Sequence, residues 1–243
     1  GLGTGVGALG VFLERRLSER LEDGLLSFAA GIMLAASFLS LLLPGLEVAA
    51  EQYEHAVSAV AVVAAGFLAG AVALSLVHRF APHEHFQLGR EGPESSTLNR
   101  LWLFVIAITL HNFPEGMAVG VGFAGGDIEN GRALALGILV QNIPEGLAVA
   151  TSLMVIGYGR LKSFGVAFLT GLVEPVGGLF GSTLVSVAVP LMPWTLGFAA
   201  GAMIFIISDE VIPETHRGAH AQFATYALMV GIVVMLLLDS ALP

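Results

Sequence analysis

The chain has 243 residues, of which 56% are apolar and only 12% are charged, with a formal net charge of −9 and no cysteine. This composition excludes an ordinary soluble domain and indicates a polytopic membrane protein. The absence of cysteine excludes disulfides and thiolate ligands, so any metal site must use nitrogen, oxygen or thioether donors. No catalytic cofactor and no nucleic-acid partner are predicted.

Eight apolar segments are predicted to cross the bilayer as helices. Residues 24–46 and 56–77 contain no charged side chain, and each exceeds the roughly 20 residues that a helix needs to cross the hydrocarbon core. The predicted spans are 1–13, 24–46, 56–77, 101–126, 133–157, 163–190, 194–212 and 221–240. We therefore predict a single all-α membrane domain of eight transmembrane helices over residues 1–243, with a cytoplasmic loop at 78–100.

The basic residues predict the orientation of these spans. If the odd-numbered connections face the cytoplasm, all but one of the 10 Lys and Arg residues lie on that side, and only Arg132 lies on the other. Both termini then face the periplasm or exterior. The outer connections are acidic, and an acidic mouth concentrates cations. Asp239 and Glu47 are predicted to be the first contacts of an entering ion.

Two strings in the second and seventh spans are similar. Residues 28–33 read FAAGIM and residues 198–203 read FAAGAM, and each string is followed by a proline, Pro44 or Pro213. By the loop count, the second span runs outward and the seventh runs inward. Related elements of opposite direction predict an inverted-topology repeat, here with a 3+2+3 arrangement, in which substrate sites lie near the membrane midplane.

A closer repeat occupies the fourth and fifth spans. Residues 111–119 read HNFPEGMAV, and residues 141–149 read QNIPEGLAV. A charged carboxylate at the bilayer centre costs at least about 2.5 kcal/mol, so it is usually paired, hydrated or bound to a cation. The same polar string placed twice inside apolar segments therefore indicates a buried cation site.

Helical geometry brings the donors of this repeat together. Positions i and i+4 share one face of a helix, so His111 with Glu115, and Gln141 with Glu145, each present two donors in one direction. Two such helices placed face to face would form a cage for an ion.

Further donors complete the predicted site. Asn112 and Asn142 flank the two pairs, Glu174 stands beside a predicted helix break at Pro175, and Met33 offers a thioether. Imidazole, amide and carboxylate donors suit a borderline divalent ion such as zinc better than sodium or magnesium. Cadmium, iron(II) and manganese stay open, as do one ion or two. A buried polar network or proton relay without metal is the alternative.

The paired HNxPEG and QNxPEG strings, the Met and Pro of spans 2 and 7, and the Glu-Pro of span 6 resemble the ZIP (Zrt/Irt-like) family of divalent metal transporters, particularly its bacterial GufA type. The resemblance covers all eight predicted spans. It implies a transport unit of spans 1, 4, 5 and 6 moving against spans 2, 3, 7 and 8, a homodimer, and a place in the bacterial inner membrane. It also implies a binuclear metal centre made by His111, Asn112, Glu115, Gln141, Asn142, Glu145 and Glu174, with Met33 near the first ion.

The predicted activity is import of a divalent cation by an elevator-type, alternating-access carrier. The ion enters past Asp239 and Glu47, loses its water in the cage, and leaves toward Glu210, His216 and His220. A divalent cation channel and, less favoured, a membrane-embedded metalloenzyme are the alternatives.

The connection at 78–100 contains two further histidines that could bind metal. His83 and His85 lie two apart in a short polar stretch with several Gly and Pro residues. Two interpretations stay open, a cytoplasmic metal-binding loop and a plain solvated connection.

Overall fold

The computed structural model describes residues 1–13, 17–80, 83–84, 90–91, 100–124, 128–155, 157–187 and 189–241. Most of these residues are helical, which confirms the predicted all-α class. The exception in this part of the chain is a short antiparallel pair, β1 (His83–Glu84) with β2 (Arg90–Glu91), in the region predicted as a loop.

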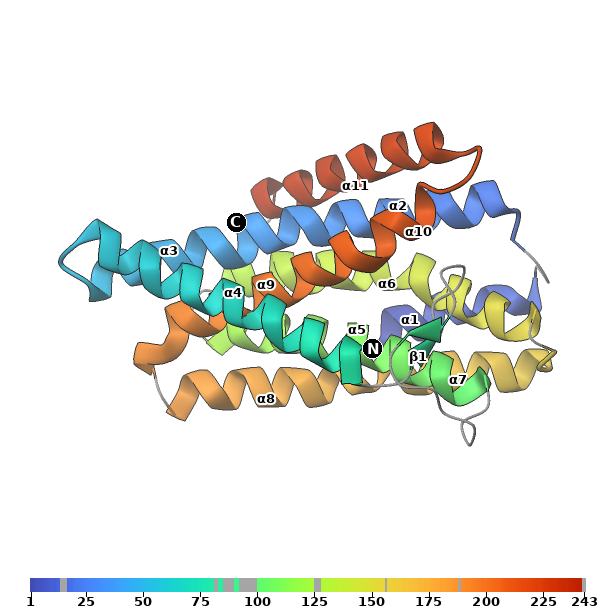
Figure 1. Ribbon diagram of the computed structural model, residues 1–243, viewed down its shortest axis with the longest axis horizontal. Coiled ribbons are helices and arrows are strands. Elements are labelled where there is room, and N and C mark those ends of the chain that lie inside the picture. The colour runs from blue at the N-terminus through green and yellow to red at the C-terminus, as the bar shows by residue number, and fades with distance from the viewer. Residues whose placement is uncertain are drawn as a thin grey trace.

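The helices form an elongated bundle along the long axis of the molecule (Figure 1). In chain order the elements are α1 (Leu2–Ala8), η1 (Leu9–Phe12), α2 (Glu19–Ala36), η2 (Ser37–Leu42), α3 (Leu43–Gln52), α4 (Ala56–Phe80), α5 (Arg100–Ala124), α6 (Ile128–Val155), α7 (Arg160–Gly171), α8 (Val173–Val187), η3 (Val189–Leu191), α9 (Met192–Ile206), η4 (Ile207–Val211), α10 (Ile212–Thr215) and α11 (Ala221–Ala241). Several join end to end, so that α2, η2 and α3 make one rod of 34 residues.

Six helical segments among the described residues are long and apolar enough to cross a membrane. They are Glu19–Gln52, Ala56–Phe80, Ile128–Val155, Arg160–Ser186, Met192–Thr215 and Ala221–Ala241. Two more segments correspond to predicted spans, the shorter apolar helix Leu2–Phe12 and the 25-residue helix α5. The chain is therefore a multi-pass membrane protein.

Glycines bring the helices together in pairs. The most extensive contacts join α5 with α8, α4 with α9, α2 with α11 and α1 with α6, and α11 lies along α2 in Figure 1. A Cβ atom on Gly31 would lie 2.0 Å from the carbonyl oxygen of Leu228, and one on Gly201 would lie 1.9 Å from that of Phe67. Backbones this close leave no room for a side chain, which is the packing that small residues allow between membrane helices.

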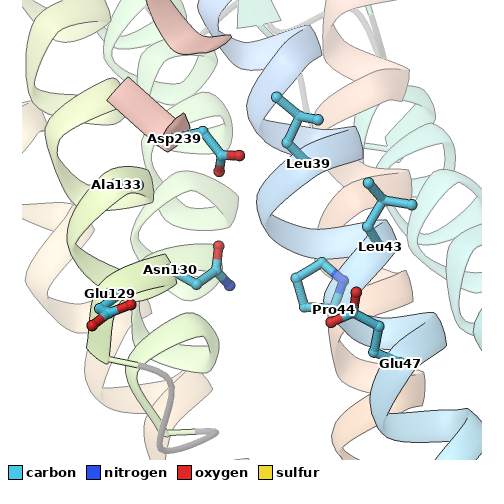
Figure 2. A pocket seen from close by; sticks show the side chains of 8 residues that line it. All are labelled: Leu39, Leu43, Pro44, Glu47, Glu129, Asn130, Ala133 and Asp239. Carbon is cyan, nitrogen blue, oxygen red and sulfur yellow. The ribbon is translucent and has the colours of Figure 1, made fainter. Parts of the chain in front are cut away.

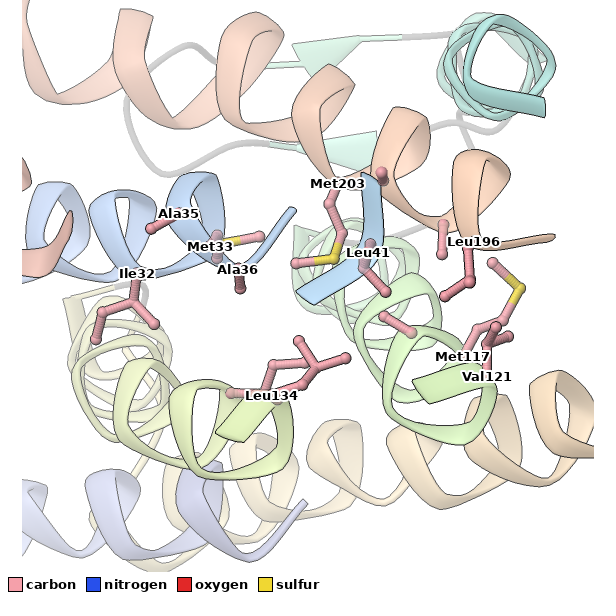
Figure 3. Packing of buried hydrophobic residues seen from close by; sticks show 14 of the residues in the cluster. Ile32, Met33, Ala35, Ala36, Leu41, Met117, Val121, Leu134, Leu196 and Met203 are labelled. Atoms are coloured by element: carbon pink, nitrogen blue, oxygen red, sulfur yellow. The ribbon is translucent and has the colours of Figure 1, made fainter. Parts of the chain in front are cut away.

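Apolar side chains fill the space between these pairs. Figure 3 shows Ile32 and Met33 of α2, Leu134 of α6, Met117 of α5 and Met203 of α9 in one buried cluster. The cluster therefore contains residues from all four helix pairs. It joins α2, α5 and α9 to the motif-bearing helix α6.

The two similar strings of the sequence lead into the same local structure. α2 ends in the π-helical turn η2 and α9 ends in the π-helical turn η4, and Pro44 and Pro213 each stand in the first turn of the helix that follows. π-helical turns are frequent at functional sites. Each turn carries a buried polar residue, Ser40 in η2 and Glu210 in η4.

Replacing Gly116 with alanine is expected to destabilise the protein by about 1–3 kcal/mol, as overpacking of a tight contact usually does. The added Cβ atom would lie 2.0 Å from the carbonyl oxygen of Glu174, so α5 and α8 would have to separate. Unfolding in mixed detergent micelles measures the change. Gly178→Ala is the matched control, because its Cβ atom would meet the Gly116 carbonyl oxygen at 3.4 Å. Equal losses for the two variants would contradict the close-packing argument.

Candidate metal site

The candidate site lies where α5 and α6 pass each other, about halfway along each helix. Pro114 and Pro144 stand inside helices that continue through them, so the repeated strings lie on unbroken helices. Glu115 and Gln141 are fully buried, and Asn142 is only 1% exposed. Polar side chains this deep need partners, so their hydrogen bonds decide what the site can do.

One hydrogen bond joins the two strings. Gln141 Nε2 donates to Glu115 Oε1 at 2.8 Å. Within the described residues, Glu115 Oε2, Gln141 Oε1 and Asn142 Oδ1 are buried without a hydrogen-bond partner. An unpartnered buried polar group costs about 1–3 kcal/mol, and more if it is charged. Three such oxygens on adjacent helices match the ligand preferences of a cation.

A third wall comes from the break between α7 and α8. The chain turns at Leu172, and Glu174 follows in the first turn of α8, where a negative charge is favoured by the helix dipole. Asn112 Nδ2 donates to the carbonyl oxygen of Thr170 at 2.9 Å, which ties α5 to the end of α7. Thr4 Oγ1 lies 3.4 Å from Glu174 Oε1, which brings α1 to this wall.

Three carboxylates are close enough for their charges to interact. Glu115 is influenced by both Glu145 and Glu174, and Glu145 by Glu174. Like charges at short range in a medium of low dielectric repel strongly. Cations or protons would relieve this repulsion, so the carboxylates favour a positively charged occupant.

His111 contacts Glu210, which lies outside the two repeated strings. Its Nε2 lies 2.5 Å from Glu210 Oε2, and His78 Nδ1 lies 2.9 Å from the other oxygen of Glu210. His111 shares a face with Glu115 but stands one helical turn away, about 6 Å along the axis. That displacement brings its ring to η4. In the described residues no group of three His, Cys, Asp or Glu side chains is arranged to hold a metal ion.

Met33 lies in the apolar cluster of Figure 3, where it is 1% exposed among Ile32, Leu41 and Met203. A methionine in such a cluster fills space between helices, and its thioether is also a donor that a soft metal ion can use.

The two predicted entrance residues line one pocket of about 320 Å³ between η2, α3, α6 and α11. Figure 2 shows Asp239, Glu129 and Asn130 on one side and Glu47 with Pro44 on the other.

Polar contacts cross the inner end of this pocket. Asn130 Nδ2 donates to the carbonyl oxygen of Ser40 at 3.0 Å, and Ser40 Oγ donates to Asp239 Oδ1 at 3.4 Å. These two hydrogen bonds link the motif-bearing helix α6 through η2 to α11.

The predicted exit residues lie in two separate environments. Glu210 is held by His78 of α4 and His111 of α5. The ring of His216 makes two hydrogen-bond contacts, from Nε2 to the Thr225 hydroxyl at 3.1 Å and from Nδ1 to the Ile212 carbonyl oxygen at 3.0 Å. The ring therefore joins α10 to α11. The carbonyl oxygen of His220 accepts from Ala224 N at the start of α11.

The loop histidines give little to compare with the prediction. The backbone of His83 pairs with Glu91 in the small sheet. The position of its side chain and the whole of His85 lie outside the described residues.

Sequence reasoning missed three residues that the structure joins to the predicted ones. Thr4 contacts Glu174, His78 contacts Glu210, and Asn130 lines the pocket of Asp239 and Glu47. Thr4 could have been singled out, because it is the one residue with a polar side chain in the apolar stretch 1–13. Nothing in the sequence relates His78 to Glu210, which stands 132 positions further along the chain.

Comparisons with known proteins agree with one another. The family described as ZIP Zinc transporter matches residues 81–239. The zinc transporter GufA of Myxococcus xanthus is 45% identical over 242 residues, covering 100% of this chain and 95% of that protein. The zinc transporter ZIPB of Bordetella bronchiseptica is 48% identical over 239 residues, covering 98% and 77%. Human zinc transporter ZIP11 is 33% identical over 320 residues, covering 98% and 94%.

Proposed function

Since the chain belongs to the ZIP family of zinc transporters, we propose that it imports divalent metal ions across a lipid bilayer toward the cytoplasm. This membership confirms the resemblance of the sequence motifs and identifies a transporter rather than an enzyme. Zinc is the proposed principal substrate, with cadmium, iron(II) and manganese as further candidates. The proposed ligands are Met33, His111, Asn112, Glu115, Gln141, Asn142, Glu145 and Glu174, around one ion or two.

One observation carries the proposed site. Glu115 Oε2, Gln141 Oε1 and Asn142 Oδ1 are buried without hydrogen-bond partners in the described part of the chain. A purely structural polar network would use these oxygens within the protein. Oxygens left open beside Glu145 and Glu174 support binding of a positively charged substrate.

The pairing of helices supports two units that move relative to each other. α1 pairs with α6 and α5 pairs with α8, while α2 pairs with α11 and α4 pairs with α9. If spans 1–3 correspond to spans 6–8 and span 4 corresponds to span 5, the pair α1 with α6 is equivalent to α5 with α8. The pair α2 with α11 is then equivalent to α4 with α9. This supports the proposed 3+2+3 inverted repeat and an elevator mechanism in which the first two pairs carry the ion.

The proposed path leads from the pocket at Asp239 and Glu47 to the buried oxygens and then past Glu210 toward His216 and His220. The proposal places both termini in the periplasm or exterior. It also includes that the protein forms a homodimer in the bacterial inner membrane. The channel alternative predicts a flux that increases without saturation.

Zinc uptake into proteoliposomes that hold a lumenal metal indicator tests the function. We expect uptake that saturates with external zinc and is absent from empty vesicles. Uptake that rises linearly over the range in which the site should fill would favour the channel. An absence of flux with every metal offered would overturn the transport proposal.

Neutralising the entrance is expected to weaken uptake in a salt-dependent way. Asp239→Asn with Glu47→Gln should raise the zinc KM about two- to fivefold at low ionic strength, because fewer cations gather at the mouth. At about 1 M salt, the Debye length is roughly 3 Å and the difference should disappear. Glu51→Gln, an exposed acid that is not among the lining residues, is the control. An effect that persists unchanged at high salt would contradict electrostatic attraction.

A further inference from the structure

Thr4 is the only residue between Gly1 and Leu13 that carries a polar side-chain group. It is 2% exposed, and its hydroxyl lies 3.4 Å from Glu174 Oε1. We propose that Thr4 is a positioning residue for Glu174, so that α1 takes part in metal binding by holding the third carboxylate of the site. This inference rests on the proposed function and extends the site to a helix that the motifs do not touch.

The backbone around Thr4 fixes its position. A Cβ atom on Gly146 would lie 2.0 Å from the carbonyl oxygen of Thr4, and one on Gly171 would lie 2.9 Å from its Cβ and 3.0 Å from its hydroxyl oxygen. Gly146 directly follows Glu145, and Gly171 precedes the turn that leads to Glu174. Two glycines therefore let α1 approach both segments that carry site carboxylates.

The hydroxyl of Thr4 differs from other buried threonine hydroxyls of this protein in the partner that it contacts. Thr151, Thr170 and Thr195 each donate to a carbonyl oxygen three or four residues earlier in their own helix. Such bonds are local and satisfy the hydroxyl within its own helix. The Thr4 hydroxyl instead reaches a carboxylate 170 positions away.

A hydroxyl in this place has a defined chemical effect. It donates to one oxygen of Glu174 and thereby restricts rotation about the last torsion of the side chain, which is otherwise broad. Partners that orient metal ligands commonly change metal affinity when they are removed. At 3.4 Å the contact is longer than the roughly 2.5–3.0 Å of ordinary O–H···O hydrogen bonds, so it is a weak one. We therefore expect an effect of several-fold rather than a loss of binding.

The test compares Thr4→Val, which keeps the shape and removes the donor, with Thr4→Ser, which keeps the donor. Zinc binding to the purified protein is measured by competition with a metal indicator, and zinc uptake is measured in proteoliposomes. Thr4→Val should raise both the zinc Kd and the KM about three- to tenfold and leave the maximal rate within about twofold. Thr4→Ser should stay within about twofold of the original protein in all three quantities.

A double-mutant cycle with Glu174→Gln separates positioning from packing. If Thr4 acts through the carboxylate, Thr4→Val should have little further effect in the Glu174→Gln protein. The proposal is overturned by an unchanged zinc Kd in Thr4→Val, by an equal loss in Thr4→Ser, or by the same loss in the Glu174→Gln background. A protein that binds zinc with the expected Thr4 dependence but carries no zinc across the bilayer would instead overturn the transport function alone.

Discussion

Zinc uptake is expected to fall by at least about a hundredfold when Glu115 is replaced by alanine. The substitution removes a fully buried carboxylate, together with the Oε2 atom that has no partner in the described residues and the acceptor of the Gln141 bond. Removing one partner of a buried, hydrogen-bonded pair that involves a charge costs about 2–5 kcal/mol. Because about 1.4 kcal/mol corresponds to a factor of ten, this range includes the hundredfold loss. Initial rates of zinc uptake into proteoliposomes measure the effect.

Two further variants show which property of Glu115 matters. Glu115→Gln keeps the size of the side chain and removes its charge, so uptake should stay low if the carboxylate neutralises the metal ion. Glu51→Ala, at an exposed position near the end of α3, should leave uptake within about twofold, since exposed substitutions away from special features have small effects. Uptake near the original level in both Glu115 variants would remove this residue from the proposed site.

Glu210→Ala is expected to destabilise the protein by about 3 kcal/mol, which is the scale for breaking a buried pair that involves a charge. Glu210 is 2% exposed, and its two oxygens contact His78 at 2.9 Å and His111 at 2.5 Å. The carboxylate thus ties η4 to α4 and α5, and alanine would leave two imidazoles without that partner. Unfolding by sodium dodecyl sulfate in mixed micelles measures the free energy.

Asp209 gives a matched control for Glu210. It is the neighbouring acid, its side chain is 48% exposed, and its nearest approach to His78 is 3.9 Å. Exposed ion pairs contribute about 0–1 kcal/mol, so Asp209→Ala should change the free energy of unfolding by less than about 1 kcal/mol. Similar losses in the two variants would mean that charge at this end of the protein matters, and not the contacts of Glu210.

Much of the architecture could be predicted from the sequence because membrane helices follow composition. Long apolar segments such as 56–77 satisfy their own backbone hydrogen bonds as helices and need no distant partner to do so. The repeated string at 111–119 and 141–149 likewise identifies itself, since polar residues are rare in such segments. The family of the protein follows from that string, and the comparisons confirm it.

The details of the candidate site depended more on neighbours than on spacing. The i to i+4 rule predicted that His111 and Glu115 share a face, but their partners lie on different elements. Glu115 meets Gln141 of α6, whereas His111 meets Glu210 of η4. Helical periodicity gives the direction of a side chain around the axis, but it does not give the height at which another helix approaches.

The sequence by itself determined a helical membrane chain, the polar doublet at 111–119 and 141–149, and membership of the ZIP family. Only the tertiary structure decided that Thr4 lies against Glu174, that Asn112 binds the Thr170 carbonyl, and that His78 and His111 share Glu210. The physical reason is the distance along the chain over which each interaction acts. Hydrophobic burial and helical hydrogen bonds act within a segment and leave a periodic pattern, whereas a contact across 170 residues depends on how whole helices pack, which local patterns do not record.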